Sequence, residues 1–202
     1  MSAFRDGEAR LMLVLVTGPV RSGKSARAAA LARAAGRPVV FAATLALDAG
    51  DAEMRERVAR HTADRPPGWR IIETGAPGAK PLREVVRDAP SGVTLVVDAL
   101  GTWLGALMLG RDDDDPVALQ RALDAEGEAL IGAFATCSAD LIVVAEETGW
   151  GVVPPTTAGR VFRDALGRLT RRAGELADRV ELVVAGFAID VRALGVAVDE
   201  VP

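Results

Sequence analysis

The chain has 202 residues, of which half are apolar and 26% are charged, and its net charge is −4. This length suits one α/β domain with a full core, and the apolar content argues against disorder. The acidic balance disfavours a nucleic-acid partner, and the single cysteine excludes an internal disulfide, which fits a reducing cytoplasm. No apolar run approaches the roughly 18 residues of a membrane span, so we expect no membrane span.

We expect residues 1–10 to form a flexible polar leader and residues 11–202 to form the domain. The apolar run at 11–16 predicts a buried first strand, and the alanine-rich segment at 26–32 predicts a helix. The segment between them reads Gly18-Pro19-Val20-Arg21-Ser22-Gly23-Lys24-Ser25.

This G-x-x-x-x-G-K-S pattern, set between a strand and a helix, predicts a phosphate-binding loop, or P-loop. Gly18 and Gly23 permit backbone angles that other residues avoid, so the N–H groups of the turn can point at phosphate oxygens. Lys24 can reach the terminal phosphates of a nucleotide, and Ser25 can place its hydroxyl on Mg²⁺. The alternative is a Gly-rich turn with an incidental lysine, but motif and context agree independently. The pattern predicts nucleotide binding and leaves the reaction open.

Short apolar runs alternate with helical patterns along the rest of the chain. Strands are predicted at 39–43, 69–73, 93–98, 141–145 and 180–185, with a short edge strand at 194–202. Helices are predicted at 51–62, 82–87, 99–109, 116–137 and 157–177. The alternation predicts a single α/β domain of the P-loop NTPase type, with a mostly parallel sheet and helices on both faces. Ligands of such a sheet bind at the carboxyl ends of the strands.

Acidic residues occur at two places where a metal site is conceivable. Asp98 ends an apolar strand, the position from which a carboxylate can hold Mg²⁺ beside the P-loop serine, directly or through water. The acidic run 112–115 lacks the spacing of a calcium loop, so we interpret it as a solvated loop in which Asp115 caps a helix that begins at Pro116. Cys137 is expected to be a small buried hydrophobe.

His61 is the only histidine in the chain. Its place on the apolar face of a predicted helix allows a structural interpretation, in which it is a satisfied core residue. A metal role is disfavoured because no second histidine or cysteine cluster accompanies it. A catalytic role is chemically sensible, because a neutral imidazole is a good nucleophile near pH 7 and can carry a phosphoryl or nucleotidyl group. The neighbouring Arg60 and Arg65 could help to bind a triphosphate.

Several segments taken together resemble one family, the bifunctional adenosylcobinamide kinase / adenosylcobinamide-phosphate guanylyltransferases of cobalamin biosynthesis. The matching residues are Val16-Thr17 with the P-loop, Phe41 to Thr44, Glu53-Met54, Arg57-Val58, His61, Arg65-Pro66, Trp69, Glu73, Asp98, Glu147, Gly149, Gly151 to Pro154, Arg160, Phe162 to Asp164 and Gly167. The resemblance covers nearly the whole chain after residue 10. Its most specific parts are the segment from His61 to Trp69 and the segment from Gly149 to Pro154.

The resemblance implies two reactions. In the first, ATP or GTP phosphorylates the hydroxyl of the aminopropanol arm of adenosylcobinamide. In the second, His61 takes GMP from GTP, releases pyrophosphate and passes the GMP to the cobinamide phosphate, which gives adenosylcobinamide-GDP. By the same resemblance, Thr44, Thr62, Arg65, Glu73 and Asp98 join the P-loop in binding the nucleotide. Ser25 and Asp98 would hold Mg²⁺, and the protein would be a cytoplasmic homo-oligomer, with a trimer as one option.

The sequence departs from the family pattern at Glu146, at Gly105-Ala106 and at Thr170-Arg171. We expect these polar differences to alter the corrinoid or base preference without touching His61 or the P-loop. Two other functions remain open at this point. One is a P-loop small-molecule kinase that lacks guanylyl transfer. The other is a non-catalytic nucleotide-binding module, although no guanine-reading N-K-x-D motif is present.

Overall fold

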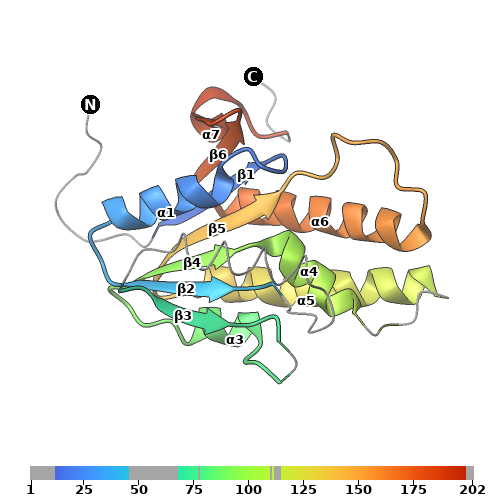
Figure 1. The fold of residues 1–202 in the computed structure, drawn as a ribbon, viewed down its shortest axis with the longest axis horizontal. Coiled ribbons are helices and arrows are strands. Elements are labelled where there is room, and N and C mark those ends of the chain that lie inside the picture. Colours follow the sequence, from blue (N-terminus) through green and yellow to red (C-terminus); the bar gives the residue numbers. More distant parts are fainter. Residues whose placement is uncertain (1–11, 46–67, 77, 110, 112–114, 199–202) are drawn as a thin grey trace.

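The computed structural model describes residues 12–45, 68–76, 78–109, 111 and 115–198, and Figure 1 shows their arrangement. These residues contain one seven-stranded sheet with the strand order β3-β2-β4-β5-β1-β6-β7. The strands are β1 (Leu13–Gly18), β2 (Val39–Ala43), β3 (Arg70–Glu73), β4 (Thr94–Asp98), β5 (Asp140–Glu146), β6 (Arg179–Val184) and β7 (Phe187–Asp190). Every neighbouring pair is parallel except β6 and β7.

Helices cover both faces of the sheet. They are α1 (Lys24–Ala34), α3 (Leu82–Arg87), α4 (Leu100–Met108), α5 (Pro116–Ala135), α6 (Thr157–Leu176) and α7 (Val191–Leu194). Along β1, Val14 and Val16 pack in the layer that includes α1, whereas Leu13 and Leu15 pack in the layer that includes α3 to α6. This alternation is the period of two that a strand covered on both sides requires. The predicted α/β architecture, a mostly parallel sheet with helices on both faces, is confirmed.

Two local predictions are also confirmed. The Asp115 side chain caps α5, since its Oδ1 accepts hydrogen bonds from the backbone N–H of Val117 at 3.1 Å and of Ala118 at 2.9 Å. Cys137 is buried, and its thiol donates a hydrogen bond to the carbonyl oxygen of Val86. Burial raises the pKa of the Cys137 thiol, which fits a structural rather than a reactive cysteine.

The edge strand predicted at 194–202 is wrong for the residues that the structure describes there. The edge strand is instead β7, which pairs antiparallel with β6 through a two-residue turn. Both turn residues have positive φ, 50° at Ala185 and 83° at Gly186, as a tight hairpin whose twist matches its strands requires. The segment after Leu194, up to residue 198, is not a strand, because the chain leaves the sheet through α7.

The predicted helix at 51–62 lies outside the described residues. Among those that are described, no helix combines the length and the apolar character needed to cross a membrane.

Candidate nucleotide-binding site

The P-loop leaves β1 and enters α1 through a tightly curled backbone. Gly18 has φ 147° and Gly23, the N-cap of α1, has φ 104°, both in the region that favours glycine. A Cβ on Gly18 would lie 2.2 Å from the carbonyl oxygen of Val183, so the loop passes β6 too closely for any other residue. Arg21 also has a positive φ, 59°, which is uncommon for a residue with a side chain and is typical of strained functional loops.

Hydrogen bonds from neighbouring elements hold this loop in place. The N–H of Glu147, just after β5, donates to the Gly18 carbonyl at 2.9 Å. The N–H of Gly186, in the β6–β7 turn, donates to the Ser22 carbonyl at 3.2 Å. The P-loop is therefore fixed from two sides, by β5 and by the hairpin. Such support preorganises backbone N–H groups for a phosphate.

Ser25 and Asp98 meet at the carboxyl ends of the strands. The hydroxyl of Ser25, in the first turn of α1, donates to Asp98 Oδ1 at the tip of β4, over 3.2 Å. Two hard oxygen donors at this spacing suit Mg²⁺, which binds proteins through one or two such groups and completes its shell with water and phosphate oxygens. Groups of three or more metal-ligating side chains are absent from the described part of the chain. The pair therefore fits a nucleotide-bound magnesium ion better than an all-protein metal cage.

Lys24 and Glu146 form the charged centre of the site. Lys24 is only 8% exposed, and its ammonium donates to the Pro19 carbonyl at 2.8 Å. Burial lowers the Lys24 pKa, while the charges of Glu146 and Asp98 oppose that shift. Burial also raises the pKa of Glu146, although the N–H of Gly101 stabilises its carboxylate through a 2.8 Å hydrogen bond. A buried ammonium held on the loop at the start of α1 is well placed to meet a phosphate.

Thr44 is engaged in supporting the Asp98 tip. Its side chain is buried, and its hydroxyl donates to the Ala99 carbonyl at 2.7 Å while accepting from the Ala99 N–H at 2.7 Å. The N–H of Thr44 also donates to the carbonyl of Asp98 at 3.2 Å. Thr44 thus joins the end of β2 to the turn between β4 and α4. In the described contacts it positions Asp98, and it does not reach the P-loop.

Of the remaining predicted site residues, the structure describes only Glu73, and it does not bring Glu73 to the P-loop. Glu73 ends β3 at the far edge of the sheet, four strand positions from β1, which is about 19 Å at the usual strand spacing. It can serve only a part of the site that is distant from the P-loop. His61, Thr62 and Arg65 lie outside the described residues.

Sequence reasoning did not assign Glu146 or Gly101 to this centre. A Cβ on Gly101 would lie 2.4 Å from Glu146 Oε2, so the glycine is required for the carboxylate to pack against the start of α4. The sequence feature that could have indicated them is their position at strand ends. Glu146 is the last residue of β5, and Gly101 follows the end of β4 by three residues. Only the strand order, which places β5 between β4 and β1, brings them beside the P-loop.

Comparison with known proteins matches residues 14–191 to the family model described as cobinamide kinase / cobinamide phosphate guanyltransferase. The chain is similar to the bifunctional adenosylcobalamin biosynthesis protein CobP of Pseudomonas aeruginosa, with 39% identity over 88% of this chain and 96% of that protein. It is 34% identical to the CobU protein of the same description from Salmonella typhimurium, over 90% of this chain and 100% of that protein. Among solved structures, a Pyrococcus horikoshii protein matches with a TM-score of 0.48 and 12% identity, over 93% of this chain and 88% of that one.

Proposed function

The chain belongs to the cobinamide kinase / cobinamide phosphate guanyltransferase family, and we propose that it carries out both of these reactions at one nucleotide site built on the P-loop. The observation that carries this proposal is the assembly of the P-loop, Lys24 and the Ser25–Asp98 pair at the carboxyl ends of the strands. This is the set of groups that phosphoryl transfer from a nucleoside triphosphate requires. The substrates are a nucleoside triphosphate, ATP or GTP, and a corrinoid with a free hydroxyl.

In the kinase reaction, the P-loop N–H groups and Lys24 would hold the terminal phosphates. The acceptor hydroxyl oxygen bonds to the terminal phosphorus and releases its proton to water. The bond from that phosphorus to the bridging oxygen breaks, and the nucleoside diphosphate leaves with the electron pair of that bond. Ser25 and Asp98 would hold the nucleotide's Mg²⁺, which supplies charge neutralisation at the phosphates. No protein nucleophile is needed, because positioning and charge neutralisation suffice.

In the guanylyl transfer, His61 is the proposed nucleophile. An imidazole nitrogen bonds to the α-phosphorus of GTP, pyrophosphate leaves with the electron pair of the broken bond, and GMP remains on the histidine. A phosphate oxygen of the phosphorylated acceptor then displaces the histidine. Thr62, Arg65 and Glu73 would complete the nucleotide site. We also propose that the protein acts in the cytoplasm and that it is a homo-oligomer. Sedimentation of the purified protein tests the oligomeric state.

The decisive experiment is to incubate the protein with GTP and no acceptor and to measure its intact mass. We expect a covalent adduct of the mass of GMP that is stable in base and labile in acid, as a phosphorus–nitrogen bond is. His61→Ala should lose the adduct but retain kinase activity, because only the second reaction uses the imidazole. Equal loss of both activities with a lowered melting temperature would instead identify His61 as a core residue.

A further inference from the structure

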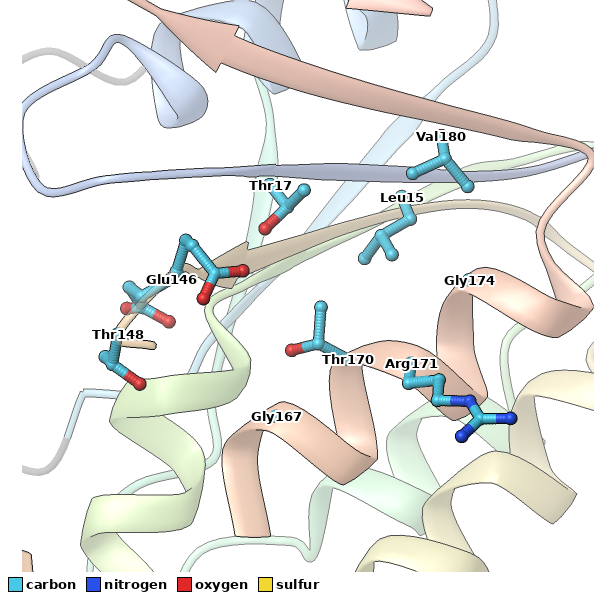
Figure 2. A pocket seen from close by; sticks show the side chains of 10 residues that line it. Leu15, Thr17, Glu146, Thr148, Gly167, Thr170, Arg171, Gly174 and Val180 are labelled. Carbon is cyan, nitrogen blue, oxygen red and sulfur yellow. The ribbon is translucent and has the colours of Figure 1, made fainter. Parts of the chain in front are cut away.

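A cavity of about 280 Å³ lies between the ends of β1 and β5 and the middle of α6. Figure 2 shows Thr17, Glu146 and Thr170 directing their side-chain oxygens toward a common space within it. These three side chains come from β1, β5 and α6. Gly167 adds no side chain, and a Cβ there would meet nothing within 4 Å, so the cavity extends to the backbone of α6.

Two of the three converging side chains lack a hydrogen-bond partner among the residues that the structure describes. Thr17 is only 9% exposed, and the hydroxyl oxygens of both Thr17 and Thr170 are buried without a partner. An unsatisfied buried polar group costs about 1–3 kcal/mol, so such groups are uncommon and each needs an explanation. Two of them facing one carboxylate across a cavity are explained if a polar group of a ligand occupies the space between them.

The chemistry of the cavity selects the ligand group. A carboxylate accepts hydrogen bonds, and each hydroxyl can accept as well as donate, so the centre suits a ligand that brings a hydrogen-bond donor. Glu147 also lines the cavity beside Glu146, so a phosphate would meet two like charges. Arg171 is the cation of the lining, and its guanidinium is paired with Glu175, outside the lining, at 3.0 Å. Leu15 and Val180 make part of the wall apolar, which suits a short aliphatic segment next to the donor.

The position of the cavity relates it to the phosphoryl-transfer reaction. Thr17 directly precedes the first P-loop glycine, and Glu146 is the register partner of that glycine, Gly18. Lys24, which is expected to hold the terminal phosphate, interacts electrostatically with Glu146. We propose that this cavity binds the hydroxyl-bearing arm of the phosphoryl acceptor, with Glu146, Thr17 and Thr170 as the hydrogen-bonding partners of the hydroxyl. This inference rests on the proposed function, since it needs an alcohol as the acceptor.

The test uses Thr170→Val, which keeps the shape of the side chain and removes only its hydroxyl. The matched control is Thr94→Val, because the Thr94 hydroxyl is also buried without a partner but lies at the start of β4, outside this cavity. Neither change breaks a hydrogen bond within the described residues, so both variants should fold. In the kinase assay, Thr170→Val should raise the KM for adenosylcobinamide about 2- to 10-fold, the effect of one neutral hydrogen bond. Thr94→Val should leave it unchanged.

Formation of the GMP adduct from GTP alone separates this inference from the proposed function. If the wild-type protein forms no adduct and phosphorylates no acceptor, the proposed function fails. If both reactions proceed and Thr170→Val leaves the acceptor KM unchanged, only the assignment of the cavity fails. An altered preference between GTP and ATP in Thr170→Val would place the guanine base in the cavity and would also overturn the assignment.

An acceptor analogue whose arm carries hydrogen in place of the hydroxyl identifies the group that is bound. It should bind the wild-type protein more weakly than adenosylcobinamide does, but should bind Thr170→Val about as well as adenosylcobinamide binds that variant. Such a loss of discrimination is the coupling expected of two groups in direct contact. If Thr170→Val weakens both compounds equally, the cavity binds a different part of the acceptor and the assignment to the hydroxyl is overturned.

Discussion

Lys24 is placed to bind the nucleotide, but burial disfavours the charged form of its amine. Burial lowers its pKa, and the carboxylates of Glu146 and Asp98 oppose that shift, which favours the charged form of the amine. The charged form is the one that binds phosphate. Its contact with the Pro19 carbonyl keeps the ammonium on the loop where the phosphates are expected.

Lys24→Ala should abolish both reactions and leave the fold intact, because both depend on a triphosphate held in one loop. A charge-assisted hydrogen bond contributes about 1.5–3 kcal/mol, so GTP should bind roughly 10- to 150-fold more weakly, and the transition state should lose more. Calorimetric titration with GTP and the melting temperature measure the two effects. GTP binding and turnover close to those of the wild type would show that this loop does not hold the phosphates.

Asp98→Asn should raise the magnesium concentration needed for half-maximal activity while affecting metal-free nucleotide binding less. The reason is that asparagine keeps an oxygen near Ser25 but loses the negative charge that a divalent cation prefers. A magnesium titration of both reactions measures the effect. An unchanged magnesium requirement would mean that Asp98 serves the structure of the turn that Thr44 supports, and no more.

At the residue scale, the sequence predicted the P-loop and Asp98 because each is a local pattern: a motif between a strand and a helix, and a carboxylate after an apolar strand. It could not predict that Thr44 is occupied by the turn after β4, because that contact joins residues 55 positions apart. It could not give Glu146 a role either, because that role depends on which strands are neighbours in the sheet.

At the scale of elements, an ion pair between a buried carboxylate and a partly exposed arginine joins α1 to β6. Arg27 donates from Nε and from a terminal nitrogen to the two oxygens of Glu181, at 2.7 Å and 2.8 Å, and the Glu181 side chain is fully buried. Arg179 also pairs with Glu181. Because α1 starts inside the P-loop, this contact fixes the helix whose first turn carries Lys24 and Ser25.

Arg27→Leu should destabilise the protein by at most about 3 kcal/mol, the low end of the range for breaking a buried pair, because Arg27 is partly exposed and Arg179 still partly compensates Glu181. For a chain of this size the melting temperature should fall by at most about 6–12 °C. The double variant Arg27→Leu/Glu181→Leu should recover part of the loss, since it removes the uncompensated charge.

Arg168→Leu is the control for this prediction, because Arg168 and Asp124 form a solvent-exposed ion pair at 3.1 Å between α6 and α5. Exposed pairs contribute at most about 1 kcal/mol. If the double variant melts below Arg27→Leu, burial of an unpaired Glu181 charge is not the cause of the loss.

The strands and helices themselves were predictable, because apolar runs and helical periods alternate along the chain. The structure places most of their ends within one or two residues of the predicted ones, for example β2 at Val39–Ala43 and α6 at Thr157–Leu176. The hairpin between β6 and β7 was missed. Its turn, Ala185-Gly186, lacks the Asn-Gly or Asp-Gly signal, and three of the four β7 residues are exposed, so no buried alternation marks the strand.

At the scale of the whole molecule, the parallel sheet brings its functional groups together at the carboxyl ends of its strands. In the register of the sheet, Ala43 pairs with Asp98 and Gly18 pairs with Glu146, so the tips of β2, β4, β5 and β1 end side by side. This arrangement concentrates carboxylates around one buried lysine. Such a site trades stability for function, since charges are held where water cannot fully solvate them.

The pH dependence of stability measures how much the buried carboxylate of Glu146 destabilises the fold. Because burial raises the pKa of Glu146 above its ordinary value of 4.5, folding disfavours the carboxylate form. Well below pH 4.5 the group is protonated in both the folded and the unfolded state, and no penalty exists. The penalty develops as the pH rises through the unfolded and then the folded pKa, and it is complete above the folded one.

Glu146→Gln should therefore melt higher than the wild-type protein at pH 7 to 8, and the difference should shrink as the pH falls toward 4.5. Each kcal/mol of relieved penalty corresponds to about 2–4 °C in a chain of this size. Glutamine can still accept the Gly101 N–H bond, and its amide can donate to the unpaired hydroxyls of Thr17 and Thr170.

Glu147→Gln is the control, because it changes the same charge one residue away and can keep the 2.9 Å bond from the Gly149 N–H. A lower melting temperature of Glu146→Gln at pH 7 to 8 would show that the carboxylate stabilises the fold. A difference that does not vary with pH would show that ionisation of Glu146 does not destabilise it.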